Sequence, residues 1–568
     1  MKFKWMNVIV SLLSLLLLFV VYYLAIPALN LKSIGFWGFL AFVFFVLSLN
    51  VLLWTHDSEL TSCVKKIRFV HCFILLALAV ILIGGFFSTN LFFARSAAEV
   101  AQVTEVEDFS EGFSDILETG STYSNLPIVD YDTAKLLGDK KVAGLKNSTW
   151  YDVDDEYNLI RYNGKYYRLS VIDYGRFFKW TKAKEAGLPG YVLVDVVPKK
   201  GTVVEEAQIV LTEEPIRYSP GAYFSHDLKR HLRFQFPSAI FDKSYLEIDE
   251  EGTPFWITGV KMPTKFLFGV PVIDSLIITN AITGESYMCN IDETPEWIDH
   301  VFSLTYVMNI THKHYAYVNG FWNNLFSKTG VLRTSYDYRD KHKNSEDSEA
   351  GKFANFYGYS SVVGPDGDIY FYTGLTAANN AESNLGWLLI NTRTGAVTQY
   401  NVVGAEESSA QAAVETLVQA QRWEATFPLP VNIGGEPSYL MALKGKSGLV
   451  QGYGIVNVDN YSIAVYDSTL EGAINAYLLK CGKTDKIDVE DEAKDEVATE
   501  TKSGEISAIY TAEVSGTTQF YYVIDGEQLY RCSITVNEKQ VLFKVGDRVT
   551  FEAEEQGEIK TIIKISLE

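Results

Sequence analysis

The sequence predicts a membrane protein with three N-terminal transmembrane helices, an α+β body of repeated hairpin-plus-helix modules, and a small C-terminal β-barrel. Three observations carry this prediction. Long apolar runs are confined to residues 1–95, a strand–turn–strand pattern recurs between residues 190 and 468, and residues 504–568 alternate between polar and apolar side chains. A chain of 568 residues is long enough for several domains.

Three apolar runs form the predicted membrane domain. Residues 8–29, 34–54 and 69–93 are each about 20 residues long, which matches the helix length that crosses the hydrocarbon core. None of them contains Asp, Glu, Lys or Arg. The first run is longer than the apolar core of a signal peptide, which is about 7–15 residues, and two further spans follow it closely. We therefore expect all three runs to be retained as spans.

Basic residues in the short loops orient these spans. Lys2 and Lys4 precede the first run, and Lys65, Lys66 and Arg68 separate the second from the third. Because positively charged loops stay on the cytoplasmic side, we expect a cell-membrane protein with a cytoplasmic N-terminus. Everything after the third span is then extracytoplasmic, and the lipid bilayer is the first expected partner.

Charge divides the chain into two parts. The whole chain carries a net charge of −21 and residues 1–95 carry +5, so residues 96–568 carry −26. An acidic body repels the phosphates of nucleic acids, so no nucleic-acid partner is expected. Cys289, Cys481 and Cys532 lack the spacing of a metal site. The sequence leaves open whether they are free thiols or whether Cys481 pairs with one of the other two.

The large region is expected to contain a stalk, a body, a linker and a barrel. Residues 96–125 mix polar residues with isolated apolar ones, which is typical of an exposed stalk. The body covers residues 126–481, and the charged segment 482–503 is predicted to be a flexible linker. In residues 504–568, about five short strands predict a small closed barrel. Its predicted turns are Ser515-Gly516, Asp525-Gly526 and Gln556-Gly557.

The body begins with a predicted hairpin that turns at Asn163-Gly164 and is followed by a helix starting near Ser170. A repeated plan then appears, in which an apolar strand ends in Asp or Asn, a Gly-containing turn follows, and a second strand returns. Helical patterns follow three of these hairpins, in residues 294–303, 406–423 and 468–479. The four copies of the hairpin pattern are residues 190–206, 275–291, 386–402 and, more loosely, 453–468.

The turns "NAITGESY" and "NTRTGAVTQY" carry a resemblance to a known family. They resemble the hairpin of PepSY domains, which are small extracytoplasmic modules associated with peptidase propeptides and cell-envelope regulators. Over about residues 120–480 the chain also resembles uncharacterised membrane proteins of Gram-positive bacteria, which supply no catalytic residues to carry over. The segment "VGDRVTFEAEEQGEIKTIIKI" is similar to the closing hairpin of an OB-fold, with an SH3-like barrel as the alternative.

One cluster of side chains is typical of acid–base chemistry. On a helix, Asp227 and His231 would share a face at i,i+4, and His226 lies beside them. These three are the catalytic candidates. The neighbouring basic residues would instead bind an anionic headgroup or a carboxylate, and the alternative is a solvated basic face. The candidate binding residues are Lys229, Arg230 and Arg233.

His312 and His314 are the candidate metal ligands. On a strand, residues two apart point the same way and can share a metal ion. No Cys or acidic residue stands nearby in the sequence, so a structural or surface pair is favoured, and no cofactor is expected.

The sequence favours a binding protein over an enzyme. It contains no P-loop, no Gly-x-Ser-x-Gly, no His-Glu-x-x-His and no dinucleotide-binding fingerprint. We therefore expect a membrane-anchored extracytoplasmic scaffold that engages protein or peptide partners of the cell envelope. One alternative is a hydrolase of envelope polymers that uses the His226, Asp227 and His231 cluster. Another is an accessory subunit of a membrane transport complex.

Overall fold

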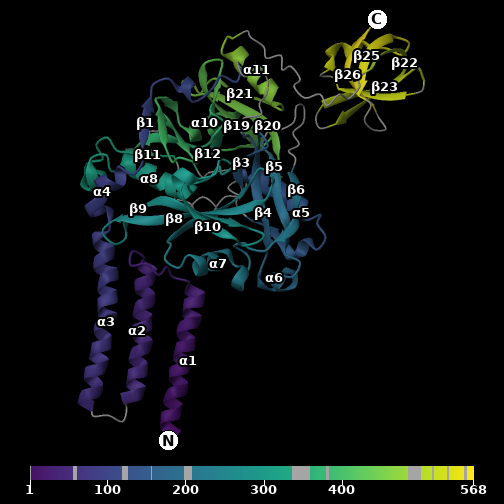
Figure 1. Cartoon of the computed structure of the whole chain (residues 1–568). Helices are drawn as coiled ribbons and strands as arrows, with labels where there is room; N and C mark the ends of the chain where they lie inside the picture. The colour runs from purple at the N-terminus through teal and green to yellow at the C-terminus, as the bar shows by residue number, and fades with distance from the viewer. Residues whose placement is uncertain are drawn as a thin grey trace. The chain divides into compact units, whose positions relative to one another are not determined.

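The fold is taken from a computed structural model (Figure 1). Its described residues fall into two compact units, Met1–Asp488 and Val489–Glu568. The described residues are 2–55, 60–117, 126–154, 157–196, 207–335, 358–378, 383–483, 500–514, 517–526, 528–533, 536–554 and 560–567.

Three helices of the first unit are long and apolar enough to cross a membrane. α1 packs beside α2, and α2 packs beside α3 (Figure 1). α1 ends at Ala25 rather than at residue 29, because Ile26 precedes Pro27 and a residue before proline is disfavoured in the helical region. The three helices are α1 (Lys2–Ala25), α2 (Ile34–Thr55) and α3 (Leu60–Phe87).

The third span ends earlier than its apolar run. α3 stops at Phe87, the chain bends at Ser88 and Thr89, and a separate helix, α4 (Asn90–Ala98), follows. The main-chain N–H of Phe268 donates to Ser88 Oγ at 2.9 Å, which ties the bend to the body. A tertiary contact therefore helps to set the end of this span, which hydropathy alone placed at residue 93.

The predicted exposed stalk is wrong for the part that the structure describes. β1 (Val103–Val106) pairs in parallel with β15 (Val397–Tyr400), and Phe113 and Ile116 are buried in the core. Residues 118–125 lie outside the described residues. The isolated apolar residues of this segment find their partners on strands that are distant in the sequence, so local composition misplaced them.

The first sheet of the body has five strands, in the order β2-β4-β5-β6 with β3 paired to β4. The turn predicted at Asn163-Gly164 is confirmed, since both residues have positive φ and join β3 to β4. The helix predicted near Ser170 is wrong. Residues 168–174 are all buried within β4, as expected of a strand covered on both faces, and the helix begins at Phe177 instead. The elements are α5 (Tyr131–Val142), β2 (Tyr151–Val153), β3 (Asn158–Tyr162), β4 (Lys165–Tyr174), α6 (Phe177–Ala183), β5 (Leu188–Asp195) and β6 (Ala207–Ile216).

Three further sheets complete the body. The second has four strands in the order β10-β9-β8-β7, the third contains β11 to β16 together with β1, and the fourth contains β17 to β21. Their bounds are β7 (Phe241–Ile248), β8 (Pro254–Lys265), β9 (Gly269–Asn280), β10 (Ser286–Asn290), β11 (Leu332–Thr334), β12 (Ser360–Val363), β13 (Ile369–Ala377), β14 (Ser383–Asn391), β16 (Gly404–Ala405), β17 (Glu424–Ala425), β18 (Leu429–Ile433), β19 (Glu436–Lys444), β20 (Val450–Asn457) and β21 (Ala464–Asp467).

The four copies of the hairpin pattern all form antiparallel strand pairs: β5 with β6, β9 with β10, β14 with β15, and β20 with β21. In the second and third pairs, the side-chain oxygens of Asn280 and Asn391 accept hydrogen bonds from the N–H groups two and three residues further on. Gly284 and Gly395 complete these turns with positive φ. The connection between β5 and β6, residues 197–206, lies outside the described residues.

Two of the predicted helices are confirmed. α10 (Glu407–Leu417) and α11 (Leu470–Lys480) follow the third and fourth hairpins. Thr469 caps α11, because its hydroxyl accepts a hydrogen bond from the N–H of Gly472.

The helix predicted at residues 294–303 is wrong. A 3₁₀ turn at Ile291–Glu293 precedes this segment, the segment itself is a loop, and α8 (Leu304–Ala316) begins only after Ser303, which caps it. The side chain of Arg393 donates to the carbonyl oxygens of residues 295, 296 and 298. These three carbonyl oxygens therefore accept hydrogen bonds from the guanidinium of a residue distant in the sequence, rather than from the main-chain N–H groups of a helix.

The core explains why the sheets lie in layers. In the second sheet, Leu246 and Trp256 are buried against the first sheet, whereas Leu276 and Ile278 are buried with α8 and the third sheet. Trp387 lies in the core between the third and fourth sheets. Both faces of the second sheet are covered at these positions, and there polar side chains such as Glu247 and Thr279 are removed from water.

The second unit is a closed five-stranded barrel in the order β22-β23-β24-β26-β25. The predicted turn at Asp525-Gly526 is confirmed by positive φ at both residues, whereas the other two predicted turns and residues 484–499 lie outside the described residues. Residues 500–503, predicted as linker, belong to β22. The strands are β22 (Glu500–Val514), β23 (Thr517–Ile524), β24 (Gln528–Ser533), β25 (Arg548–Glu554) and β26 (Lys560–Leu567).

Candidate functional site

The predicted helix at the His/Asp cluster is α7 (Leu228–Gln235), and Asp227 is its N-cap. The Asp227 carboxylate accepts a hydrogen bond from the N–H of Arg230 at 2.8 Å, and burial raises the pKa of this carboxyl. His231 Nε2 lies 2.7 Å from the carbonyl oxygen of Gly284. The same nitrogen lies 2.8 Å from Gln235 Nε2 on the same helix. The side chains of Asp227 and His231 therefore have different hydrogen-bond partners.

The two histidines of this cluster meet at an aromatic ring. The ring centroids of His226 and His231 lie 5.6 Å and 4.2 Å from that of Tyr218. Burial, followed by the nearby Arg217, lowers the pKa of His226, which favours its neutral form. His231 joins α7 to the β9–β10 turn through Gly284 and also contacts Tyr218, the ring that His226 contacts.

The two predicted binding arginines fasten α7 to the end of α1. Arg230 Nε donates to the carbonyl of Tyr23 at 3.2 Å, and its guanidinium lies 4.6 Å from the centre of the Tyr23 ring. Arg233 is 3% exposed and donates to the carbonyls of Ile26 and Ala239 at 3.1 and 2.5 Å. Both guanidinium groups thus bind the protein's own backbone, whereas Lys229 is exposed.

The prediction that His312 and His314 lie on a strand is wrong, because both lie on α8. His314 Nδ1 lies 2.9 Å from the carbonyl oxygen of Ala98, which joins α8 to the end of α4. Two positions along a helix point in different directions, so the two rings lack the shared orientation that a strand would have given them. Among the described residues, no group of three His, Cys, Asp or Glu side chains is placed to hold a metal ion.

A cleft of about 500 Å³ lies between α7, the first sheet and β7. Its apolar wall comes from residues that the core holds in place, including Leu228 and Leu232, which are one helical turn apart on α7. Trp256 contributes from β8, and its Nε1 donates to the carbonyl of Tyr218 at 2.8 Å. A cavity of this size and character is typical of ligand sites.

Polar and charged groups of both signs line the same cleft. They are Asp154, Asn158, Asp227, Lys229, Asp242, Lys243 and Ser244. Asp242 is held by Lys261 Nζ at 2.6 Å and by the hydroxyl of Ser303 at 2.7 Å. These contacts fix the carboxylate in position.

The loop at Pro220 forms another part of the cleft wall. Asp173 anchors it, because this carboxylate accepts hydrogen bonds from Ser219 Oγ at 2.7 Å and from the N–H of Gly221 at 2.8 Å. Burial raises the pKa of Asp173 to about 6 despite these donors. On the other side of the loop, a more open hollow of about 780 Å³ shares Asp154 and Pro220 with the cleft.

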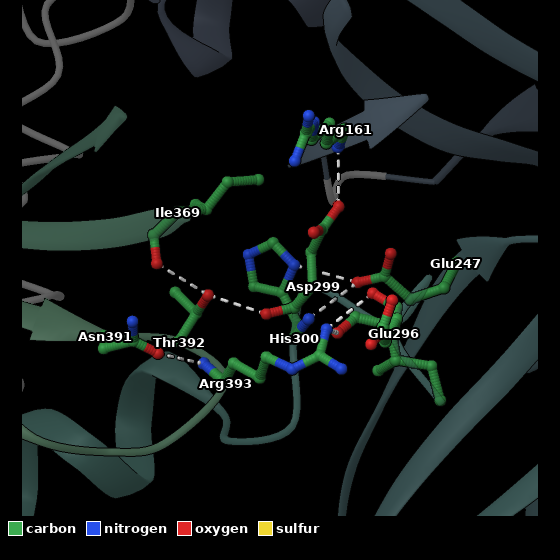
Figure 2. A network of polar contacts seen from close by, with 10 residues as sticks. Arg161, Glu247, Glu296, Asp299, His300, Ile369, Asn391, Thr392 and Arg393 are labelled. Atoms are coloured by element: carbon green, nitrogen blue, oxygen red, sulfur yellow. Dashed lines mark hydrogen bonds and ion pairs between the residues drawn. The ribbon is translucent and has the colours of Figure 1, made fainter. Parts of the chain in front are cut away.

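A second polar cluster lies at the junction of the first three sheets (Figure 2), and Glu247 and His300 at its centre are buried. Glu247 on β7 is 1% exposed, and its Oε1 lies 2.9 Å from His300 Nδ1 and 3.1 Å from the main-chain nitrogen of His300. Glu247 Oε2 is buried and makes no hydrogen bond within the described part of the chain. Asp299 accepts a hydrogen bond from the N–H of Arg161 on β3 at 2.6 Å.

The third sheet joins this cluster through one turn. Thr392 Oγ1 lies 2.7 Å from the carbonyl oxygen of Asp299 (Figure 2). The guanidinium of Arg393 donates to the carbonyl oxygens of residues 295, 296 and 298, in the loop that leads to Asp299. The cluster thereby connects β3, β7 and the β14–β15 turn.

Burial sets the protonation of this cluster. It raises the pKa of Glu247 to about 8 and lowers that of His300 to about 4. Burial, followed by the neighbouring Glu247, raises the pKa of Asp299 to about 7. At pH 7 Glu247 and His300 are both neutral, so their contact is a hydrogen bond between neutral groups.

The sequence pattern did not single out Glu247 or His300. Glu247 alternates with Leu246 and Ile248, so the period of a strand would place its side chain on the solvent face, and no local signal marked this carboxyl group as buried. The partner lies 53 residues away, on a loop that was predicted to be a helix. The cleft residues Asp242 and Ser244 were missed for a similar reason, because one wall of the cleft comes from a different sheet.

Comparisons with known proteins find no protein-family model that matches this chain and no curated protein with significant sequence similarity to it.

Proposed function

We propose that this protein is a membrane-anchored, extracytoplasmic binding protein of the cell envelope, and that the cleft beside α7 binds a short peptide segment of a partner. The observation that carries the proposal is the cleft itself, which combines an apolar wall with carboxylates and lysines. A peptide presents matching chemistry, since it has apolar side chains, main-chain polar groups and charges of both signs.

The position of the cleft suits a membrane-anchored binder. Leu228 and Leu232 line the cleft, while Arg230 and Arg233 on the same helix bond to the carbonyls at the end of α1. One short helix therefore connects the ligand site to a membrane span. A partner held in this cleft would be kept close to the bilayer.

Further features support the proposed orientation in the membrane, the PepSY-like modules and the OB-like barrel. Lys2, Lys4 and the basic residues at the start of α3 favour a cytoplasmic N-terminus and an extracytoplasmic body. The Asn-x-x-Thr-Gly turns of two hairpins support PepSY-like modules. In the barrel, β22 pairs with both β23 and β25, and β24 runs parallel to β26, which supports an OB-like barrel serving as an accessory binding module.

Selection of peptides tests the proposed site. The full chain in lipid nanodiscs is incubated with a random-sequence peptide library, and bound peptides are sequenced. We expect the selected peptides to share an apolar residue flanked by charged ones. The variant Ser244→Trp, which fills the cleft, should weaken the binding of a selected peptide at least about tenfold, equivalent to about 1.4 kcal/mol. Lys446→Trp, on an exposed loop of the fourth sheet, is the matched control.

Two results would count against the proposal. One is a library from which no peptide is enriched. The other is enrichment that Ser244→Trp leaves unchanged while its unfolding midpoint stays at the wild-type value, because the peptide would then bind elsewhere.

The sidedness is tested separately on intact cells. We expect added protease to release the C-terminal barrel from the cell surface. Protection of the barrel until the cells are lysed would reverse the assigned orientation.

A further inference from the structure

Exposed Phe and Trp side chains of the body are concentrated near the ends of two spans. Every exposed Phe or Trp that the structure describes after residue 98 lies in one of three groups, near the end of α1, the end of α3 or the start of α4. The seven residues are Phe177, Phe178, Phe224, Phe234, Phe266, Trp322 and Phe326, and we call them the interfacial aromatics.

The first group lies beside α1. Phe234 of α7 has its ring centroid 6.2 Å from Tyr22 and 6.1 Å from Tyr23, near the last turn of α1. Arg230 links α7 to the rest of the group, since its Nη1 donates to the carbonyl of Phe224 at 2.9 Å. The rings of Phe177 and Phe224 are 6.3 Å apart, which brings α6 into the same group.

The second group lies at the end of α3. Phe266 occupies the turn between β8 and β9, and its ring centroid is 6.0 Å from that of Phe87, the last residue of α3. The hydrogen bond from the Phe268 N–H to Ser88 Oγ holds the same turn against the span.

The third group lies beside α4. Trp322 and Phe326 stack with ring centroids 5.8 Å apart, on a segment that packs against α4. Asn90 at the start of α4 donates to the hydroxyl of Tyr317 at 3.2 Å. All three groups thus adjoin chain that leads into or out of a membrane span.

Two of these residues adopt a costly backbone conformation. Phe224 has a φ of 55° and Phe266 a φ of 51°, which is the left-handed region that bulky residues rarely adopt. Their side chains are 52% and 53% exposed, so burial in the protein does not offset the cost. Strained residues with exposed apolar side chains are typical of a contact surface.

The charge of the first group also departs from that of the body. Residues 176–184 contain four basic residues and no acidic one, although residues 96–568 carry a net charge of −26. Arg176 and Lys182 are exposed on either side of Phe177 and Phe178. Aromatic rings at the interface and basic residues facing anionic headgroups are how proteins lie on a lipid surface.

We propose that the body docks on the bilayer surface through the interfacial aromatics, and that Arg176 and Lys182 bind anionic phospholipid headgroups there. The contact surface is continuous with the spans α1 and α3, so the same leaflet is within reach of all three groups. Docking would fix the body, and with it the cleft beside α7, against the membrane.

Fluorescence quenching by lipids tests this proposal with the full chain. Phe178, which is 78% exposed, is replaced by an environment-sensitive fluorescent amino acid, and nanodiscs contain a lipid with a nitroxide near its headgroup. The control position is Leu479 on α11, which is 77% exposed. We expect quenching at position 178, little at 479, and stronger quenching at 178 when phosphatidylglycerol is added to phosphatidylcholine.

Charge variants test the headgroup contact. In nanodiscs containing phosphatidylglycerol, the double variant Arg176→Gln/Lys182→Gln should lower the equilibrium constant for docking of the body on the bilayer about 25-fold. This corresponds to about fivefold for each charge. The matched control Lys140→Gln/Lys141→Gln, on exposed residues of α5, should leave it unchanged.

Each outcome is decisive. Equal quenching at 178 and 479 overturns the docking of the body. Quenching at 178 that is insensitive to phosphatidylglycerol, or to loss of Arg176 and Lys182, overturns the headgroup contact. Because Phe178 and both basic residues are exposed, loss of folding does not account for a negative result, and the unfolding midpoint of each variant verifies this.

Discussion

Arg233 on α7 donates from Nε to the carbonyl oxygen of Ile26, at 3.1 Å, across 207 residues of sequence. Ile26 is the first residue after α1, so this contact joins the membrane domain to the body. The same guanidinium also donates to the carbonyls of Phe236, Pro237 and Ala239. One buried side chain therefore donates hydrogen bonds to the carbonyl oxygens of four residues. None of these four residues belongs to a helix or a strand.

Replacement of this arginine should destabilise the junction. Arg233→Met removes the donors and leaves buried carbonyls unpaired, and we expect a loss of about 3 kcal/mol in the free energy of unfolding. Lys229→Met, an exposed position on the same helix, should change it by less than about 0.5 kcal/mol. Denaturant unfolding in detergent measures both. Equal effects of the two substitutions would contradict the anchoring role.

A buried ion pair should couple the first and fourth sheets. Lys444 Nζ on β19 lies 2.6 Å from Asp130 Oδ2, and the side chains of Lys444 and Asp130 are both less than a tenth exposed. Asp130 is also the N-cap residue of α5. Asp130→Asn keeps a capping oxygen but removes the carboxylate charge that lies against Lys444, so we expect a cost of about 3–5 kcal/mol.

A double-mutant cycle with Lys444→Met measures this coupling. The double variant removes both charges and should cost clearly less than the sum of the two single variants. Additive losses would show that the two charges do not interact in the folded protein.

The buried cluster should make stability depend on pH. The folded pKa of Glu247, about 8, lies above its ordinary value of 4.5, so the folded protein keeps a proton that the unfolded chain releases. This contribution is fully present below pH 4.5 and is lost as the pH rises to 8. Asp299, with a pKa of about 7, acts in the same direction. His300 acts in the opposite direction, but only between about pH 4 and 6.5.

Between pH 6.5 and 8 we therefore expect stability to fall as the pH rises, by up to about 1.4 kcal/mol per pH unit for each proton. Glu247→Gln should remove the contribution of Glu247 from this slope. Glu296→Gln, at an exposed carboxyl group on the adjoining loop, is the matched control. Unfolding midpoints across this range give the slopes, and an unchanged slope in Glu247→Gln would rule out the assigned protonation.

Alanine substitutions at two glycines distinguish the cost of backbone strain from the cost of a steric clash. Gly284 and Gly435 have φ values of 78° and 80°, so alanine is strained at either position. A Cβ on Gly435 would meet nothing within 4 Å, whereas one on Gly284 would lie 2.4 Å from the Tyr218 ring. We expect Gly435→Ala to cost about 1–2 kcal/mol and Gly284→Ala to cost about 1–3 kcal/mol more. Equal costs would show that the Tyr218 ring yields easily.

The sequence predicted those parts of the fold that depend on neighbouring residues. The three apolar helices, the antiparallel pairs of the repeated pattern, the helices α10 and α11 and a C-terminal barrel each have a local period or a turn signal. The errors occurred where a distant contact outweighs local preference. Residues 294–303 form a loop held by Arg393, and β1 pairs with β15 instead of forming a stalk.

The candidate site depends still more on tertiary structure. The sequence identified the helix that carries Asp227 and His231, but α7 uses those side chains to cap itself and to bind the β9–β10 turn. The wall of the cleft that comes from β7 and the pairing of Glu247 with His300 were decided only by the packing of sheets. Hydropathy and turn chemistry act over a few residues, whereas burial brings together side chains that are far apart in the chain, and it is burial that sets their contacts and their protonation.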